Sequence, residues 1–336
     1  MKIIIPMAGR GSRLRPHTLT VPKPLIPIAG KPIVHRLAED ITRISKGKVE
    51  EIAFITGDFG QEVEDKLLEI AQNLGAKGTI YRQEEPLGTA HAVYCAKESL
   101  SGPVVVAFAD TLFHADFELD TQHDGVIWVK QVEDPSAFGV VKVDENNVIT
   151  DFIEKPTDFV SDLAIIGIYF FKDGDNLKKE LAYLIDNNIM NSGEYQLTAA
   201  LENMKQKGIE FTPGKVDQWM DCGNKAVTVD TNSRVLQFQK ETIKSASAKI
   251  ENSLIIDPCF IGDNVEIINS KIGPNVSLGN GTKVHNCNID NSLIQESSDI
   301  RNANLTDTMI GNKAKYYGAQ RSVSLGDFSE MDFLTK

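Results

Sequence analysis

The chain has 336 residues, 41% of them hydrophobic and 24% charged, which excludes collagen-like, disordered and disulfide-scaffold proteins and suffices for one large or two modest cores. Its 35 Lys and Arg against 47 Asp and Glu leave a net charge of −12, which argues against nucleic acid or an anionic membrane surface as the main partner. No apolar run approaches the ~20 residues of a membrane span and no signal peptide is recognisable, so we expect a cytoplasmic protein with four reduced cysteines.

The first 110 residues alternate between strand and helix patterns. Residues 2–7 form a buried strand pattern, which a glycine-rich loop and then a helical pattern at 31–45 follow. The alternation continues with strand patterns at 51–56, 78–83 and 103–110 and with helical patterns at 60–74 and 88–99. Such alternation predicts an α/β fold with a Rossmann-like, mixed or mostly parallel sheet, whose ligands bind at the carboxyl ends of the strands.

From residue 124 the pattern becomes rich in strands. Apolar runs at 125–132, 138–155 and 163–172 come before two further helical patterns at 176–187 and 194–207. We expect this strand-rich insert to form a second lobe over the sheet. A last helical stretch at about 224–244 ends this part of the chain.

The texture changes after residue 245, where aromatic residues become scarce and Asn, Asp and Ser more frequent. Short aliphatic-led hexads begin at Ile261, Ile272, Leu278 and Ile310, and an NSxI or DTxI echo starts at Asn252, Asn269, Asn291 and Asp307. This periodicity resembles the left-handed hexapeptide β-helix, with roughly 18 residues per coil and one inward aliphatic side chain per hexad. We therefore predict two domains, at 1–245 and 246–325, with residues 325–336 as a cap; an irregular Asn-rich tail is the alternative.

A cationic, glycine-rich segment follows the first strand. Residues 1–38 contain seven Lys and Arg and no Asp or Glu. Gly9 and Gly11 would let backbone N–H groups approach a phosphate closely, and Arg13 and Lys23 add positive charge. The segment matches neither the GxxxxGK[ST] loop nor the GxGxxG dinucleotide fingerprint. It favours a small, highly charged anion such as a polyphosphate.

The longer string in this segment is more specific. GRGSRLRPHT at 9–18 and PKPLIPIAGKP at 22–32 resemble the signature of the sugar-1-phosphate nucleotidyltransferases, or nucleotide-sugar pyrophosphorylases. Further motifs of that family follow in the same order at 83–90, 110, 138–141, 154–156, 167–169, 193–198 and 219–223. The overall likeness is closest to the long-form glucose-1-phosphate thymidylyltransferases, which carry a β-helix after the catalytic domain.

The resemblance implies an enzyme that joins a nucleoside triphosphate to a sugar-1-phosphate and releases pyrophosphate, with dTTP and glucose-1-phosphate favoured. It implies a Mg²⁺ cofactor held by Asp110 and Asp221, with Arg13 and Lys23 as the other catalytic residues. The implied nucleotide-binding residues are Ala8, Gly9, Gly11, Ser12, Arg13, Gln83, Pro86, Gly88 and Thr89. The implied sugar-phosphate-binding residues are Lys23, Gly139, Glu154, Lys155, Gly167 and Glu194.

Several alternatives stay open. Ser192 stands where the short thymidylyltransferases have an arginine, so mannose-1-phosphate with GTP, or a UTP-dependent reaction, competes with the favoured substrates. Two remote alternatives are a hexapeptide-repeat acyltransferase using His285 and a catalytically inactive nucleotide-sugar sensor. His91 fits a packing or capping residue better than a catalytic base. The exposed ends of a short β-helix favour a homo-oligomer.

Overall fold

The structure of the protein, a computed structural model, describes residues 1–9, 11–45, 49–114 and 119–318. Contacts divide the chain into two compact units, Met1–Thr231 and Asn232–Lys336. The division falls inside helix α6 (Lys225–Gln239), whereas the sequence led us to place the boundary at residue 245. The predicted cap at 325–336 lies outside the described residues.

Unit 1 is built on one nine-stranded mixed sheet, which agrees with the predicted fold class. Its parallel half has the order β5–β4–β1–β6, and each of these strands coincides with a predicted one. The bounds are β1 (Lys2–Pro6), β4 (Glu51–Thr56), β5 (Lys77–Arg82) and β6 (Val104–Ala107). The side chains of β1, β4 and β6 form near-continuous buried runs, as expected for strands that are covered on both faces, whereas β5 at the edge of the sheet is only partly buried.

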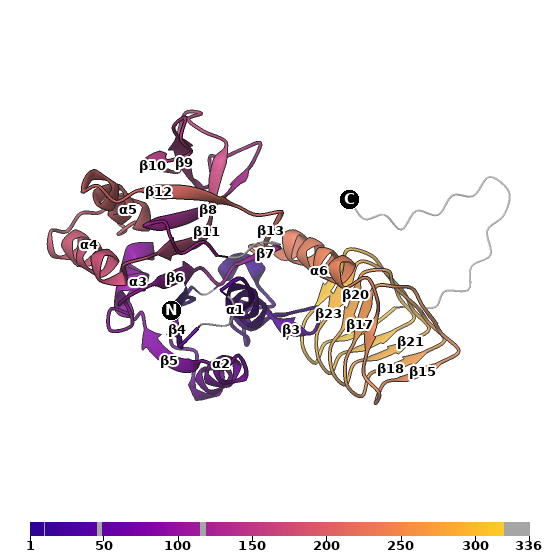
Figure 1. Ribbon diagram of the computed structural model, residues 1–336. Coiled ribbons are helices and arrows are strands. Elements are labelled where there is room, and N and C mark those ends of the chain that lie inside the picture. The colour runs from indigo at the N-terminus through magenta and orange to yellow at the C-terminus, as the bar shows by residue number, and fades with distance from the viewer. Residues whose placement is uncertain (10, 46–48, 115–118, 319–336) are drawn as a thin grey trace. The chain divides into compact units, whose positions relative to one another are not determined.

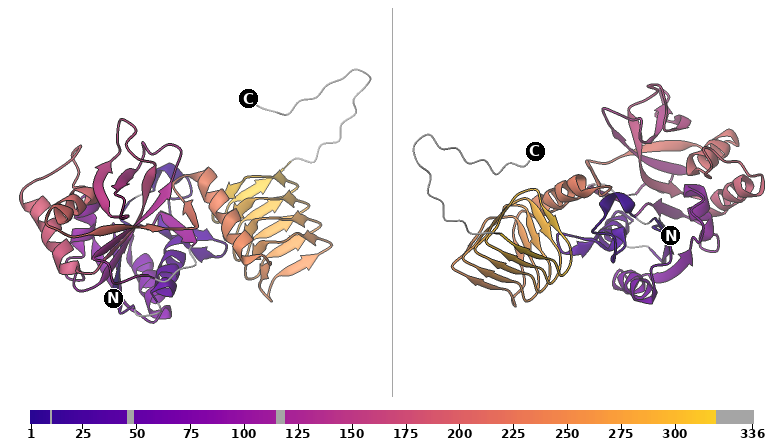
Figure 2. Two further views of the ribbon diagram at one scale, coloured as in Figure 1. Left: turned by 45° about the horizontal axis from the view of Figure 1, so that its top comes forward. Right: turned by 180° about the vertical axis from the view of Figure 1, so that it is seen from behind.

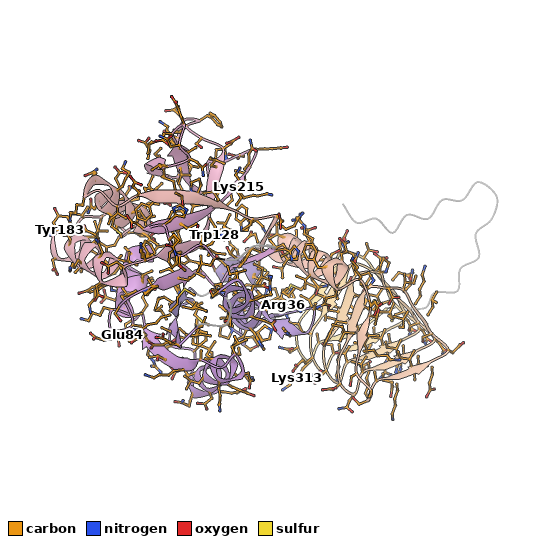
Figure 3. The ribbon with its side chains drawn as sticks, viewed as in Figure 1. Arg36, Glu84, Trp128, Tyr183, Lys215 and Lys313 are labelled. Atoms are coloured by element: carbon orange, nitrogen blue, oxygen red, sulfur yellow. The ribbon has the colours of Figure 1, made fainter. Side chains whose placement is uncertain are left out.

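The strand-rich insert does not form a separate lobe, and that prediction was wrong. Its longest strand, β11 (Leu163–Phe171), pairs antiparallel with β6 and so continues the same sheet. Nearly all of β11 is buried, because its LAIIGIYFF run is apolar on both faces. The remaining strands of the sheet are β8 (Gly125–Gln131), β9 (Gly139–Val143), β10 (Ile149–Glu154) and β12 (Phe211–Lys215). Trp128 on β8 lies buried among them (Figure 3).

Helices cover both faces of this sheet, as predicted (Figure 1). Helices α3 (Thr89–Cys95), α4 (Gly174–Asp186) and α5 (Leu197–Gln206) share one core cluster with the strands. Helices α1 (Ile33–Ile44) and α2 (Gln61–Asn73) lie on the other face. Three helices are clearly shorter than predicted, since α3 ends at Cys95, α5 begins only at Leu197 and α6 ends at Gln239. None of the helices in the described ranges is long and apolar enough to cross a membrane.

Some short elements carry no sequence signal that we recognised, and they matter for the site. Strands β7 (Thr111–His114) and β13 (Gln218–Asp221) form a two-stranded antiparallel ribbon. The glycine-rich loop contains two 3-10 turns, η1 (Ser12–Leu14) and η2 (Lys23–Leu25), and a small hairpin of β2 (Pro27–Ile28) and β3 (Lys31–Pro32) precedes α1.

Unit 2 contains the predicted parallel β-helix, whose stacked strands are visible in Figure 2. Three sheets of parallel strands form its faces, and aliphatic side chains such as Ile261, Ile272 and Leu278 fill the interior. The first face consists of β14 (Ile243–Lys244), β17 (Cys259–Ile261), β20 (Val276–Leu278), β23 (Ser292–Ile294) and β26 (Met309–Ile310). The second consists of β15 (Lys249–Glu251), β18 (Glu266–Ile268), β21 (Lys283–His285), β24 (Asp299–Arg301) and β27 (Lys315–Tyr317). The third consists of β16 (Leu254–Ile255), β19 (Lys271–Ile272), β22 (Asn288–Ile289) and β25 (Asn304–Leu305).

The coils are shorter than the 18 residues that the sequence suggested. Lys249 pairs with Glu266 and Glu266 with Lys283, which makes two coils of 17 residues, and the next two coils have 16. The NSxI echo therefore does not mark one corner of the β-helix. Asn252 and Asn269 stack at one corner, whereas Asn291 and Asp307 stack at another.

The frequent Asn residues have a backbone reason. The corner residues have positive φ, a conformation that Asn tolerates better than most residues with a side chain. They include Asn252, Asn264, Asn269, Asn275, Asn286, Asn291 and Asn302, with φ between 38° and 62°. At one corner the amides also form a ladder, in which each Nδ2 donates to the Oδ1 one coil further on, from Asn252 to Asn302. The corners thus stabilise the stacking of the coils as well as the turns.

One face of the β-helix carries charges of alternating sign. The first residues of β15, β18, β21, β24 and β27 are paired in register along the stack, and they are Lys249, Glu266, Lys283, Asp299 and Lys315. Neighbouring strands lie about 4.8 Å apart, so every charge has opposite charges on both sides where the coils continue. This pattern therefore stabilises the observed register, in which the first residues of neighbouring strands are paired.

Reversing the central charge should therefore destabilise the β-helix. In Lys283→Glu two attractive neighbours become repulsive, and we expect the free energy of unfolding to fall by about 1–2 kcal/mol. Because salt screens exposed charges, the loss should shrink in 0.5 M NaCl. Urea denaturation at low and high salt measures both effects.

Lys271→Glu is the matched control. Lys271 is also the exposed first residue of a β-helix strand, but its register neighbours are Leu254 and Asn288, which are uncharged. An equal loss of stability in both variants, or a loss that salt does not change, would show that the charge ladder contributes nothing.

Candidate functional site

The glycine-rich loop opens at the carboxyl end of β1 and lines a cavity of about 440 Å³ in unit 1. Of the predicted site residues, the cavity wall includes Ala8, Gly9, Gly11, Ser12, Arg13, Lys23, Gln83, Pro86, Gly88, Thr89, Asp110 and Glu194. The wall thus gathers side chains and backbone from segments far apart in the sequence. Its place at the strand ends agrees with the expectation for an open α/β sheet.

The conformation of the loop explains its glycines. Gly11 has φ of 61°, and a Cβ there would lie 2.8 Å from the Cβ of Lys23, so only glycine lets the two segments of the loop pack together. At Gly9 a Cβ would meet no atom within 4 Å. Gly9 therefore faces the open space of the cavity, where a ligand has access to its backbone.

Lys23 is a buried cation at the cavity wall. It is only 7% exposed, although lysine is rarely buried without a partner, and its Nζ lies 3.4 Å from Asp110 Oδ2. Pro22 and Pro24 flank it, and η2 begins at Lys23 itself. The fold therefore fixes the lysine stem beside the carboxylate of Asp110.

The ribbon of β7 and β13 brings Asp110 and Asp221 together. Asp110 lies in the turn just before β7, and Asp221, the last residue of β13, pairs with Thr111. The backbone N–H of Cys222 donates to the carbonyl of Asp110 over 3.1 Å, which ties the two segments again. Two carboxylates that are 111 positions apart in the sequence thus lie on neighbouring segments. Asp110 lines the cavity, whereas Asp221 is not among its lining residues and reaches the wall only through its neighbour Gly223.

Asp221 lies in an environment that disfavours its charged form. Burial, joined by the nearby charge of Asp110, raises the pKa of Asp221 above its ordinary value. Lys23, the backbone N–H of Gly223 and Arg13 act in the opposite direction. The site therefore holds two carboxylates with an incomplete complement of positive charge.

This pair fits a hard divalent cation. Carboxylate oxygens are the ligands that Mg²⁺ prefers, and the two acids already repel each other, which a cation would relieve. Within the described residues no group of three or more His, Cys, Asp and Glu joins to form a metal site. Mg²⁺ at a nucleotide is expected to bind one or two protein carboxylates. Phosphate and water oxygens fill the remaining positions of its coordination shell.

Close packing also shapes the approach to Asp221. A Cβ at Gly223 would lie 2.8 Å from Asp221 Oδ2, so glycine is needed where the carboxylate folds back over the chain. The hydroxyl of Thr231 donates to the carbonyl of Asp221 over 2.6 Å. Cys222 between them is fully buried, and burial raises the pKa of its thiol to about 12, so this cysteine stays protonated.

Gln83, Gly88 and Thr89 form another part of the cavity wall. Gln83 follows β5, and Thr89 begins α3. A Cβ at Gly88, whose φ is 108°, would lie 2.5 Å from the carbonyl oxygen of Tyr195. The Thr89 hydroxyl accepts a hydrogen bond from the Leu197 N–H, so α5 is tied to the same wall.

The predicted sugar-phosphate residues occupy a different neighbourhood. Of that set only Lys23 and Glu194 line the 440 Å³ cavity; Gly139, Glu154, Lys155 and Gly167 do not. Glu154 Oε2 accepts a hydrogen bond from Thr198 and would lie 3.2 Å from a Cβ at Gly139. Glu154 and Lys155 also form an ion pair at 3.7 Å. Gly167 reaches the cavity through Phe108, whose N–H donates to its carbonyl.

The buried Tyr169 lies between the two neighbourhoods. Burial and the charges of Glu154 and Asp110 all raise its pKa, which shows that both carboxylates act on the same phenol. Tyr169 is therefore near enough to both Asp110 and Glu154 for their charges to reach it.

Several residues at the site were missed by the sequence analysis. Phe108 and Gly223 line the cavity, and His91 contacts Gln83 through its Nδ1. Thr198 donates a hydrogen bond to Glu154, and the charges of Glu154 and Asp110 act on Tyr169. Thr198 and Gly223 stand inside motifs that we had quoted, so the motifs were a signal for them. Tyr169 ends the 167–169 motif as well, but only Gly167 of that motif was assigned to the site, because the apolar run of β11 made Tyr169 resemble a core residue.

A second cavity of about 1010 Å³ adjoins the first and shares Ala8, Gly9, Gln83 and Pro86 with it. Arg15, Leu19, Phe59 and Glu84 are among its other lining residues, and Figure 3 shows Glu84 at the surface of unit 1. The wall between the two cavities thus consists of the glycine-rich loop and the Gln83 segment.

Comparison with known proteins places this site in a family context. Residues 2–237 match the model of the Nucleotidyl transferase family. Glucose-1-phosphate thymidylyltransferase of Streptomyces antibioticus is 29% identical over 324 residues, which cover 89% of this chain and 88% of the relative. The bifunctional protein GlmU of Methanocaldococcus jannaschii is 33% identical over 260 residues, which cover 76% of this chain and 59% of the relative.

Solved structures with the same fold include a UDP-glucose pyrophosphorylase complexed with UDP-glucose. It has a TM-score of 0.57 and 23% identity, over 70% of this chain and 98% of that one. A putative glucose-1-phosphate thymidylyltransferase from Bacillus anthracis has a TM-score of 0.59 and 24% identity, over 73% and 97% of the two chains. These similarities establish the fold of the part of the chain that they cover.

Proposed function

The chain belongs to the nucleotidyl transferase family, and from this premise we propose that it transfers a nucleotidyl group from a nucleoside triphosphate to a sugar-1-phosphate. One observation carries the proposal. Lys23 and Asp110 lie side by side at the cavity that the glycine-rich loop lines, and Asp221 is close enough for the charges of both to act on its carboxylate. Carboxylates for a cation, a buried ammonium and a glycine-rich loop whose backbone faces the cavity are the groups that phosphoryl-type transfer needs.

The reaction involves no covalent intermediate with the protein. An oxygen of the sugar phosphate attacks the α-phosphorus and forms a new P–O bond. The bond from the α-phosphorus to the bridging oxygen of the β-phosphate breaks, and its electron pair leaves with pyrophosphate. Both substrates are anions, so the protein contributes mainly by orientation, worth up to about 7–11 kcal/mol, and by charge neutralisation.

The residues of the chain divide this work. Backbone N–H groups of Gly9, Gly11 and Ser12 hold the triphosphate, and Arg13 neutralises charge that develops toward pyrophosphate. Lys23, which is held against Asp110, offers its ammonium to the phosphates. Asp110 and Asp221 would hold Mg²⁺, which when bound would supply positive charge to neutralise the phosphates.

The neighbourhood of Glu154 is proposed as the sugar side. Carboxylates of Glu154 and Glu194 accept hydrogen bonds from sugar hydroxyls, and Lys155 binds the sugar phosphate. Gly139 leaves room beside Glu154, and Gly167 leaves room beside Phe108. The acceptor would thus enter from the Glu154 side while the nucleotide fills the cavity.

Glucose-1-phosphate and dTTP are the substrates that we favour. The relative from Streptomyces antibioticus supports this choice, because its similarity extends over 89% of the chain and so includes β-helix residues. UTP with a sugar-1-phosphate, and GTP with mannose-1-phosphate, are the alternatives. They differ from dTTP in base contacts worth about 1–3 kcal/mol each.

A substrate matrix tests the proposal. The full chain with Mg²⁺ is incubated with each of five triphosphates (dTTP, UTP, GTP, ATP, CTP) and with glucose-, mannose- and N-acetylglucosamine-1-phosphate, and pyrophosphate release is measured. We expect the highest kcat/KM for dTTP with glucose-1-phosphate. A higher value for another pair would replace the favoured substrates, and no release from any pair would contradict the transferase proposal itself.

We also propose that copies of the chain assemble through the β-helix. Its first coil leaves Ile243 and Leu254 about half exposed, at 48% and 56%, which a subunit contact would cover. The mass of the particle in analytical ultracentrifugation decides this point, since a single-chain mass of 37.0 kDa would contradict it.

A further inference from the structure

The Gln83 side chain makes two hydrogen bonds within the protein, both through the same end of its amide. Its Nε2 lies 3.3 Å from the carbonyl oxygen of Gly88 and 3.1 Å from Nδ1 of His91 on α3. Its backbone N–H donates to the Thr56 carbonyl, so the chain at Gln83 is anchored to the sheet as well. Two contacts thus hold the side-chain amide, and a third fixes the backbone that carries it.

The carbonyl of Gly88 determines which end of the amide faces it. A backbone carbonyl only accepts hydrogen bonds, so the NH₂ group, and not the oxygen, must lie beside it. The second N–H of the same NH₂ group then points to His91 Nδ1, which must present a lone pair. His91 is therefore neutral, with its proton on Nε2.

The other end of the amide is left for a ligand. Within the described part of the chain Gln83 Oε1 accepts no hydrogen bond, and it is not among the buried unpaired atoms. Gln83 also lines the 440 Å³ cavity beside Gly88 and Thr89. The cavity wall therefore offers a free, fixed acceptor.

We infer that His91 is a positioning residue, which fixes the Gln83 amide so that its oxygen meets the nucleobase. The inference rests on the proposed function, because it assigns the base of the triphosphate to this wall. An acceptor suits bases that carry N–H at the ring nitrogen of the pairing edge, which are thymine, uracil and guanine. In cytosine and adenine that ring nitrogen has a lone pair, which would face Oε1.

The surroundings of His91 also favour its neutral form. Burial lowers its pKa below the ordinary value of 6.5, and Glu85 is the charged group that opposes this shift. Protonation would place a proton on Nδ1 against the NH₂ group of Gln83. The orienting contact should then be lost as the pH falls below 6.5.

Two substitutions test the inference in the full chain. His91→Phe keeps a ring but removes the acceptor, and we expect KM for dTTP to rise about tenfold with kcat within a factor of two. The preference for dTTP over dCTP in kcat/KM should fall about tenfold. His91→Asn can place its amide oxygen near the position of Nδ1, and we expect it to restore both values to within about threefold of the wild type.

Calorimetric binding of dTTP and dCTP separates this inference from the proposed function. If the wild type binds dTTP more tightly than dCTP and His91→Phe narrows the gap, the positioning role holds even where pyrophosphate release fails. A dTTP-to-dCTP ratio that His91→Phe leaves unchanged, or equal losses in His91→Phe and His91→Asn, would overturn the inference. In the wild type KM for dTTP should rise below pH 6.5, and in His91→Asn this rise should be absent.

Discussion

Replacing Asp221 by asparagine is expected to abolish most activity while leaving the fold at least as stable as before. Burial and Asp110 raise the pKa of Asp221, which means that the carboxylate form is less favourable in the folded protein than in water. Asparagine keeps the shape and an oxygen that accepts the Gly223 N–H, but it removes the buried charge. The same change removes a cation ligand, and we expect kcat to fall about 10²–10³-fold.

Asp110→Asn should lose activity to a similar extent, but unlike Asp221→Asn it should also destabilise the fold. Asp110 is half exposed, but its partner Lys23 is buried and would lose its counter-charge. This variant should therefore unfold at a lower temperature, in contrast to Asp221→Asn. The kcat of the double variant should be little lower than that of the less active single variant, because the two carboxylates act as one site.

Three measurements check these expectations together: pyrophosphate release at several Mg²⁺ concentrations, dTTP binding by calorimetry, and thermal unfolding. Asp186→Asn is the control, since Asp186 is an exposed residue at the end of α4, away from the cavity wall. Nucleotide binding that survives while pyrophosphate release is lost identifies an enzyme rather than a sensor. Full activity in either single variant would contradict the role of the pair.

The position of the site could be predicted because local sequence features determine it. An apolar strand followed by a glycine-rich, cationic loop shows where β1 ends. In an open α/β sheet ligands bind at the carboxyl ends of the strands, so residues near this loop were expected at the site. The convergence of Asp110 and Asp221 is different. It depends on pairing between two four-residue strands, β7 and β13, which are about a hundred residues apart and too short for a period-2 pattern. Only the family resemblance indicated that pair.

The error over the strand-rich insert has a similar origin. The local pattern correctly indicated strands, but it contains no information on their partners. The antiparallel register of β11 with β6 decides that the insert joins the main sheet, and this pairing is long-range. The contact of His91 with Gln83 was within reach of the sequence, since a tight turn at Gly88 brings the start of α3 back to the end of β5.

In the β-helix the general architecture follows from periodicity, whereas coil length and corner identity do not. Several turn positions accept Asn, Asp, Ser, Lys or Gly, so an echo in the sequence does not show which corner it marks. The hydrogen-bonded ladder from Asn252 to Asn302 is visible only once the coils have 17 and 16 residues. The sequence also does not show how much room there is between neighbouring coils. The glycines of the β-helix indicate where that room is too small for a side chain.

Gly273→Ala should be among the most destabilising substitutions in the β-helix. Gly273 has φ of 103°, which lies outside the left-handed region that Asn or Ala can enter. A Cβ there would overlap the carbonyl oxygen of Ile256 and lie 2.8 Å from Cys259 Sγ, and both atoms belong to the packed neighbouring coil. Because backbone cannot move aside cheaply, we expect the free energy of unfolding to fall by about 3–5 kcal/mol.

Gly281→Ala separates overlap from backbone strain. Gly281 also has a positive φ, of 67°, but the nearest atom to its Cβ would be Ser297 Oγ at 3.5 Å, an ordinary contact. Alanine there should cost only the left-handed conformation, about 1–2 kcal/mol. Urea denaturation gives the two free energies, and hydrogen exchange with mass spectrometry should locate the lost protection in β14–β27 rather than in β1, β4 and β6. Equal losses in the two variants would mean that the coil at Ile256 yields to the extra methyl group, and that the spacing between coils is set by the corners alone.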